Sequence, residues 1–263
     1  MSDATLVEHA DGVLTITFNR PHRKNALDAD NWNDLDAAVA RASADPEVRA
    51  VVLTGAGGNF SAGADLSGDG GGSLTGGPPR AILHEMRTVG EIVRRLQRLP
   101  KPTLALVDGV AVGVSLGLVL ACDLIVASDR ARFAEIFVRR GLALDGGTSW
   151  TLPRAVGIRR AKQMAFFGDM VPAAQALEWG LINEVVPAEE LATVGAGWAR
   201  RLAAAPTTAI SLIKRMLDDS AQNSIEQSLE EEARSQHIAY TTADMHEGIA
   251  AFVERREARF TGR

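Results

Sequence analysis

Cysteine is almost absent from this chain of 263 residues, in which Cys122 is the single example. One cysteine excludes an intrachain disulfide, and nothing else in the sequence suggests secretion. Cys122 lies within the apolar run LVLACDLIVA. We therefore expect it to be a small core residue and not a reactive thiol.

Long apolar runs are also missing, and none approaches the roughly 20 residues that a membrane span requires. The first residues, MSDATLVEHADG, contain neither the basic region nor the apolar region of a secretory signal. We therefore expect no membrane partner and a cytoplasmic location.

Concentrated positive charge is the third absence. The formal net charge is −5, and no cluster of Lys and Arg is interleaved with aromatic residues. This argues against a nucleic-acid partner, because phosphate binding relies on local positive charge. The sequence also lacks metal-ligand spacing, a Walker motif and a G-x-G-x-x-G pattern. We expect neither a metal site nor a permanently bound cofactor.

What is present favours one large α/β domain. Hydrophobic residues make up 46% of the chain and charged residues 23%, which suits a globular protein with a sizeable core. Strand patterns alternate with amphipathic helix patterns, which argues for parallel strand pairing. The expected strands are 13–18, 49–54, 103–107 and 124–127, and the expected helices are 28–42, 81–99 and 115–122.

The pattern changes toward the end of the chain, where it is helical only after Pro206. We place a core over residues 1–200 and a helical region over 201–263. These helices are amphipathic but too short for a core of their own, so we expect them to pack against a neighbouring subunit. The glycine-rich segment 66–79 is interpreted either as a disordered surface loop or as a mobile flap beside a site.

The segment GVSLG, residues 113–117, fits G-x-S-x-G, the nucleophile elbow of serine hydrolases. That hypothesis needs Ser115, then an acid (Asp145 or Asp169), then a histidine (His237 or His246). It leaves FSAGADL and NRPHRKNALD unexplained, and both histidines fall at amphipathic positions of the helical tail. We expect Ser115 instead to cap the buried helix that follows.

Several segments, taken in order and spacing, resemble the enoyl-CoA hydratase/isomerase (crotonase) family. They are NRPHRKNALD at 19–28, FSAGADL at 60–66, KPTLALVDGVAVG at 101–113, ACDLIVAS at 121–128, WGLINEVVP at 179–187 and EGIAAFVERREARF at 247–260. The resemblance implies a spiral of ββα repeats with C-terminal trimerisation helices. It also implies an acyl-CoA substrate and a homotrimer or hexamer.

The resemblance assigns an oxyanion hole to the backbone N–H groups of Ala64 and Val114. Thioester chemistry builds negative charge on the carbonyl oxygen, which two aimed N–H groups stabilise. Gly63 and Gly113 would let the backbone approach the ligand closely. Helix 115–122 begins at this turn, and its dipole favours an anion there.

The resemblance also implies the positions that bind CoA. They are Arg23, Lys24, Ala26, Leu27, Ala62, Asp65 and Leu66, with Phe252 and Arg255 reaching CoA from a neighbouring subunit. Arg23 and Lys24 are candidates for contact with the CoA phosphates. From the residues alone, the same pair is equally a solvated basic turn.

The reaction depends on which carboxylates are present. Hydratases of the family use two glutamates, and here the corresponding positions are Gly117 and Phe137, the latter expected to line the substrate site. Glu135 is two residues away from the second position and is interpreted as structural. Ordinary hydration is therefore in doubt.

Asp145, in GLALDGGTSW, resembles the catalytic aspartate of the family's isomerases. A single base suffices to move a proton between carbons of an enolate. Burial beside Phe137 and Trp150 would raise the pKa of Asp145 toward usefulness. On local sequence alone Asp145 is a helix N-cap or a turn residue before Gly146 and Gly147. The resemblance favours an isomerase that uses Asp145, and it leaves open a hydratase with atypical acid/base residues and a non-catalytic acyl-CoA-binding homologue.

Overall fold

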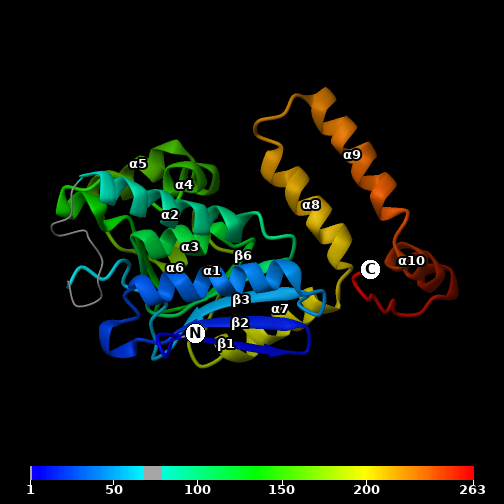
Figure 1. Cartoon of the computed structure of the whole chain (residues 1–263), viewed down its shortest axis with the longest axis horizontal. Coiled ribbons are helices and arrows are strands. Elements are labelled where there is room, and N and C mark those ends of the chain that lie inside the picture. Colours follow the sequence, from blue (N-terminus) through cyan, green and yellow to red (C-terminus); the bar gives the residue numbers. More distant parts are fainter. Residues whose placement is uncertain (1, 68–78) are drawn as a thin grey trace.

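The computed structural model describes residues 2–67 and 79–263. A twisted sheet forms the centre, helices cover both of its faces, and the last three helices extend away from this body (Figure 1). Most of the glycine-rich segment 66–79, for which flap and loop interpretations were open, lies outside the described residues.

The main sheet has six strands in the order β1-β2-β3-β4-β6-β9. Only the β1–β2 pair is antiparallel, and the other neighbours are parallel, as expected for strands joined through helices. Their bounds are β1 Thr5–Ala10, β2 Val13–Phe18, β3 Ala50–Gly55, β4 Thr103–Val107, β6 Leu124–Ser128 and β9 Glu184–Val186. A smaller sheet, in the order β5-β7-β8, consists of Val110–Val112, Arg132–Ala134 and Val171–Pro172.

The central strands are apolar at successive positions because both sheet faces are covered. Leu104 and Leu106 of β4 pack in a small cluster with α7, whereas Ala105 and Val107 point into the main core on the other face. This explains why residues 103–107 form a continuous apolar run and do not alternate with polar residues.

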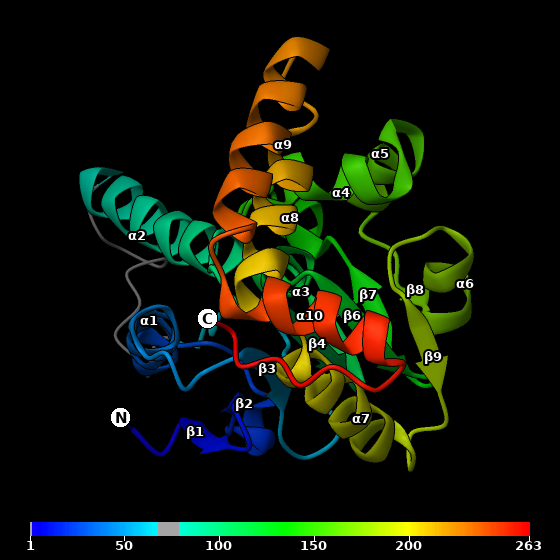
Figure 2. The ribbon, with the colours of Figure 1, turned by 90° about the vertical axis from the view of Figure 1, so that its right-hand side faces the viewer.

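Helices α1, α2 and α3 lie on the main-core side of the sheet, and α7 lies on the opposite side (Figures 1 and 2). Asp28 caps α1 through a reciprocal pair of hydrogen bonds with Asn31. The helices are α1 Ala29–Ala44, α2 Pro79–Gln97, α3 Val114–Ala121, α4 Thr148–Val156, α5 Ile158–Phe167, α6 Ala173–Glu178, α7 Leu191–Ala204, α8 Thr207–Asp219, α9 Ile225–Ala239 and α10 Ala243–Glu254, with short 3-10 helices η1 Pro21–Arg23 and η3 Ile136–Arg140.

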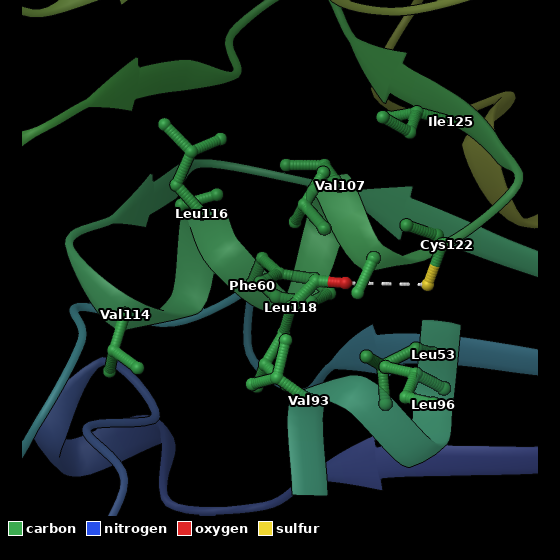
Figure 3. Close-up of a cluster of buried hydrophobic side chains, with 14 of the residues drawn as sticks. Leu53, Phe60, Val93, Leu96, Val107, Val114, Leu116, Leu118, Cys122 and Ile125 are labelled. Carbon is green, nitrogen blue, oxygen red and sulfur yellow. Dashed lines mark hydrogen bonds between the residues drawn. The ribbon is translucent and has the colours of Figure 1, made fainter. Parts of the chain in front are cut away.

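Apolar side chains from several elements pack around α3 (Figure 3). Leu116 and Leu118 are fully buried there, and the Cys122 thiol lies 3.5 Å from the Leu118 carbonyl oxygen. Burial raises the pKa of the Cys122 thiol to about 12, which keeps it protonated at physiological pH. Cys122 is a core residue, as the sequence predicts.

The C-terminal region forms a separate arm of α8, α9 and α10 in Figure 1, and Figure 2 shows that the last residues run back along α10. Arg49 ties this region to the sheet by donating hydrogen bonds to the Ala205 and Phe260 carbonyls. The division at residue 200 stays a prediction; the helix that crosses it, α7, packs on the sheet and ends at Ala204.

Candidate active site

Three loops meet at the carboxyl ends of neighbouring parallel strands. They follow β2, β3 and β4 and carry the segments 19–28, 56–66 and 108–114. Leu27 N–H donates to the Gly63 carbonyl over 2.8 Å, and Ser61 N–H donates to the Val110 carbonyl over 2.9 Å. Carboxyl ends of parallel strands are a common place for ligand sites because loops converge there.

Two glycines shape the turns at this point. Gly63 and Gly113 have φ angles of 88° and 59°, values that favour glycine. A Cβ on Gly63 would lie 2.8 Å from the Val112 carbonyl oxygen. The N–H groups of the next residues, Ala64 and Val114, have no acceptor among the described residues. Two adjacent turns thus end in unpaired N–H groups, and Val114 begins α3.

Two cavities open at these turns. The first, here the α1–α2 cavity, has a volume of about 250 Å³, and the second, here the Phe137 cavity, about 340 Å³. Both are lined by Ala64, Met86, Val114 and Asp145. The α1–α2 cavity continues past Leu27, Trp32, Val89 and Ile92, and the Phe137 cavity past Leu66, Ile82, Phe137 and Leu142. A ligand that spans both cavities passes Asp145 and both free N–H groups.

Asp145 lies in the turn before α4. Its Oδ1 is buried and has no hydrogen-bond partner among the described residues. Burial raises its pKa to about 6. The cap interpretation is wrong, because Gly147 is the N-cap of α4 and makes no side-chain cap bond. Trp150 lies elsewhere, in a groove against α8, so among the predicted neighbours only Phe137 shares a cavity with Asp145.

Gly117 has no room for a side chain. A Cβ there would lie 2.4 Å from the Gly146 carbonyl oxygen, closer than real Cβ atoms come to any atom. The obstacle is the backbone of the Asp145 turn, which no rotamer change can remove. α3 and this turn therefore pack backbone to backbone, and the position of Gly117 cannot hold a glutamate in this arrangement.

Glu135 is a buried carboxyl that the sequence interpretation treats as structural. It is fully buried, lines neither cavity and has no partner on either carboxylate oxygen among the described residues. Burial raises its pKa to about 8, opposed by the Thr148 side chain and reinforced by the charge of Asp145. Buried polar groups in proteins are normally hydrogen-bonded, so a buried carboxyl without a partner indicates a role beyond packing.

Arg20 and Asn25 hold the first two loops together, and the sequence analysis missed both. Arg20 forms salt bridges with Asp65 at 2.8 Å and Asp28 at 3.2 Å. Hydrogen bonds from Ser67, together with Arg20, lower the pKa of Asp65 to about 2 against the effect of its own burial. The Asn25 side chain is buried and donates to the Ala56 carbonyl over 2.8 Å. A buried polar residue inside NRPHRKNALD was the available signal.

The predicted CoA positions fall into three groups. Leu27 and Asp65 line the α1–α2 cavity, and Ala62 and Leu66 line the Phe137 cavity. The other positions in the first loop are next to this site without lining it: Arg23 and Lys24 are exposed, and Ala26 is half-buried.

Phe252 and Arg255 are on α10 or at its end, both exposed, and line neither cavity of their own chain. Phe252 is 84% exposed, so it does not belong to the hydrophobic core of its own chain.

The serine-hydrolase hypothesis is wrong. Ser115 Oγ is fully buried and lies 2.9 Å from the Ser61 carbonyl oxygen and 2.8 Å from that of Val112. His237 and His246 are exposed on α9 and α10 and do not contact it. Ser115 is not the helix cap either, because Gly113 occupies the N-cap position of α3. It fastens the glycine turn to the loop after β3.

Metal and membrane features are absent from the part of the chain that the structure describes. No group of three or more His, Cys, Asp or Glu side chains there could hold a metal ion. No helix among those residues is long and apolar enough to cross a bilayer.

An α/β fold that places two unpaired N–H groups and the buried carboxylate Asp145 beside two connected apolar cavities is typical of enzymes that act on acyl thioesters. The enoyl-CoA hydratase/isomerase family model matches residues 8–263, so this chain belongs to that family. It has the crotonase fold, and the members of its family are acyl-CoA enzymes. Its relatives carry different activities in their names.

The 1,2-epoxyphenylacetyl-CoA isomerase of Escherichia coli is 38% identical, covering 98% of each chain. A probable enoyl-CoA hydratase of Rhodobacter capsulatus is also 38% identical, over 97% of each chain. The crystal structure of a putative enoyl-CoA hydratase from Streptomyces coelicolor superposes with a TM-score of 0.94 at 35% identity, covering 99% of this chain and 94% of the other. Because the names of these relatives give different activities, similarity alone does not decide which reaction this protein catalyses.

Proposed function

We propose that this protein binds an enoyl-CoA thioester and moves its double bond, with Asp145 as the base. The observation that carries the proposal is the position of Asp145, the carboxylate shared by both cavities, next to the free N–H groups of Ala64 and Val114. Asp65 also lines the α1–α2 cavity, but its salt bridge to Arg20 holds it away from this role.

The reaction follows from these three groups. Asp145 takes a proton from the carbon between the thioester carbonyl and the double bond of a 3-enoyl-CoA. The C–H electron pair forms a dienolate, whose oxygen accepts hydrogen bonds from the Ala64 and Val114 N–H groups. The proton then passes from Asp145 to the far carbon of the dienolate, which restores the carbonyl and leaves a 2-enoyl-CoA. The carboxylate is regenerated, and no water is consumed.

Hydration is the first alternative, and the packing of Gly117 disfavours it. Addition of water to an enoyl thioester needs a group that holds the water and a group that supplies a proton. One of the family's glutamate positions has no room for a side chain, and the other is Phe137. A hydratase would have to use Asp145 for both tasks.

A non-catalytic acyl-CoA-binding protein is the second alternative. Such a protein would have no need for an aspartate whose pKa is raised toward neutrality.

Turnover of matched 3-enoyl-CoA and 2-enoyl-CoA thioesters tests the proposal, with CoA binding measured by calorimetry. Isomerisation of the 3-enoyl substrate without formation of 3-hydroxyacyl-CoA is the expected result. Hydration of the 2-enoyl substrate at a comparable rate would overturn the choice of reaction. Tight binding of both thioesters without turnover would instead identify a ligand-binding protein.

The pH dependence of the rate is a further prediction. Asp145 must be ionised to accept a proton, and its pKa is raised to about 6. We expect kcat/KM to fall about tenfold per pH unit as the pH drops below that value, and to level off around neutral pH. A pH–rate profile checks this; a fall centred near the ordinary pKa of an aspartic acid would show that the base is a more exposed group.

We infer that the arm formed by α8, α9 and α10 joins subunits into a homotrimer or hexamer. Its large apolar side chains face outward, among them Leu217, Ile225, Leu229, Phe252 and Val253. Exposed apolar patches on this scale are typical of protein interfaces.

Phe252→Asp is expected to shift the assembly toward monomers in sedimentation experiments and to weaken CoA binding across subunits. Glu254→Gln, on the same helix, is the control and is expected to leave the assembly unchanged. Trimers that persist in the Phe252 variant would show that this residue is not at the interface.

A further inference from the structure

Glu135 is a second carboxyl close to the proposed base, and nothing in the mechanism above uses it. It follows β7 and is the N-cap residue of η3, the 3-10 helix that carries Phe137 into the cavity wall. The preceding residue, Ala134, accepts a 2.9 Å hydrogen bond from the Gly113 N–H of the oxyanion turn. Glu135 is thus built into the same framework that holds the proposed oxyanion hole.

Among the described residues, the charge that acts on Glu135 is that of Asp145, and no cation compensates it. Thr148 is linked to both residues, because its side chain opposes the rise in the pKa of Glu135 and its hydroxyl donates to the Asp145 backbone carbonyl over 3.0 Å.

The arginines of the neighbouring elements are engaged elsewhere or lie at the cavity wall. Arg132 of β7 donates to the Ala131 carbonyl, Arg139 of η3 pairs with Asp169, and Arg140 lines the Phe137 cavity. Arg160 of α5, the helix packed against η3, lies over the Trp179 ring.

Burial of two carboxylates close enough to affect each other is costly, because each loses hydration and repels the other. One of the pair must therefore keep a proton over a wide range of pH, as in other coupled acid pairs. Glu135 is fully buried, whereas Asp145 faces two cavities open to ligand and solvent. Desolvation therefore acts more strongly on Glu135, which keeps the proton while Asp145 ionises.

We propose that Glu135 is a positioning residue that stays protonated at neutral pH and so keeps a second negative charge away from Asp145 and the proposed oxyanion hole. Its ionisation in mildly alkaline solution would place a second negative charge beside the forming enolate. That charge opposes enolate formation and also favours the protonated, inactive form of Asp145. The proposal deepens the proposed function and rests on it for the effect on rate, but the protonation of Glu135 is measurable without any substrate.

The test compares the wild-type protein with Glu135→Gln, which keeps the size of the side chain and mimics a neutral acid. Glu178→Gln, an exposed glutamate of α6, is the matched control. The first readout is the infrared band of a protonated carboxyl at pH 7, recorded without ligand. We expect this band in the wild type and in Glu178→Gln, and its loss in Glu135→Gln. An unchanged band in Glu135→Gln, or none in the wild type, would overturn the proposal whatever the enzyme's reaction is.

The second readout is the pH profile of kcat/KM with a 3-enoyl-CoA. For the wild type we expect a falling limb near pH 8, where Glu135 ionises. Glu135→Gln should keep the wild-type rate at pH 7 within about threefold and lose the falling limb. A falling limb that persists in the variant contradicts the proposed effect on rate. If the infrared band is lost in Glu135→Gln as expected but no thioester is isomerised, Glu135 is confirmed as a protonated acid and the proposed function is wrong.

Discussion

Replacement of Asp145 by Asn is expected to reduce kcat/KM for a 3-enoyl-CoA by about 10²–10⁴-fold, the usual contribution of a positioned general base. Asn keeps the shape of the side chain but cannot take the proton. Its amide is neutral, so the cost of burying the Asp145 carboxylate disappears and the fold should be at least as stable. Because the N–H groups of Ala64 and Val114 are untouched, the affinity for the thioester should change little.

Steady-state kinetics and calorimetry on the same preparations measure the two effects separately. Asp169→Asn is the matched control, since Asp169 is an exposed aspartate that pairs with Arg139 on the surface. The control should retain wild-type turnover. Full activity of the Asp145 variant would remove the proposed base, and equal losses of binding and rate would assign Asp145 to ligand binding alone.

Gly117→Ala is expected to have the second largest effect. Adding a methyl group to a helical glycine normally stabilises the helix by about 1 kcal/mol. Here the new Cβ would lie 2.4 Å from the Gly146 carbonyl oxygen, so the Asp145 turn must shift. Overpacking of this kind typically costs about 1–3 kcal/mol. A shift of the base by a fraction of an ångström also reduces its rate, and we expect kcat/KM to fall at least tenfold.

The chain offers a matched control in Gly90 of α2. A Cβ at Gly90 meets nothing within 4 Å, so Gly90→Ala should gain stability of about 0.8–1 kcal/mol. Chemical denaturation of both variants compares the same substitution in contact and in open space. Equal stabilisation by the two substitutions would show that α3 and the Asp145 turn are not packed as described here.

The order of strands and helices was largely predictable because the sheet is covered on both faces. Buried parallel strands such as β4 are continuous apolar runs, which stand out in the sequence. The antiparallel edge strand β1 was missed, since TLVEHA is buried on one face only and carries Glu8 and His9. The short strands β5, β7 and β8 have two or three residues each and are too brief for a periodic signal.

The site was predictable where a local motif fixes the backbone. Gly63 and Gly113 need positive φ angles, so the two turns and their free N–H groups follow from the motifs. The side-chain environment was not predictable, because burial depends on residues far apart in the chain. The role of Asp145 as a cap was excluded only by the position of Gly147. That the buried carboxylate oxygens of Glu135 lack a hydrogen-bond partner among the described residues was visible only in the structure.

The backbone contact between Gly117 and Gly146 also limits how this activity can change under selection. A glutamate at position 117 is harmful until the turn at 145–147 has been rebuilt, and a rebuilt turn displaces Asp145 before any new acid is in place. A selection that accumulates single beneficial substitutions therefore meets a barrier between the isomerisation proposed for this protein and hydration. A library that varies residues 117 and 144–148 together avoids that barrier.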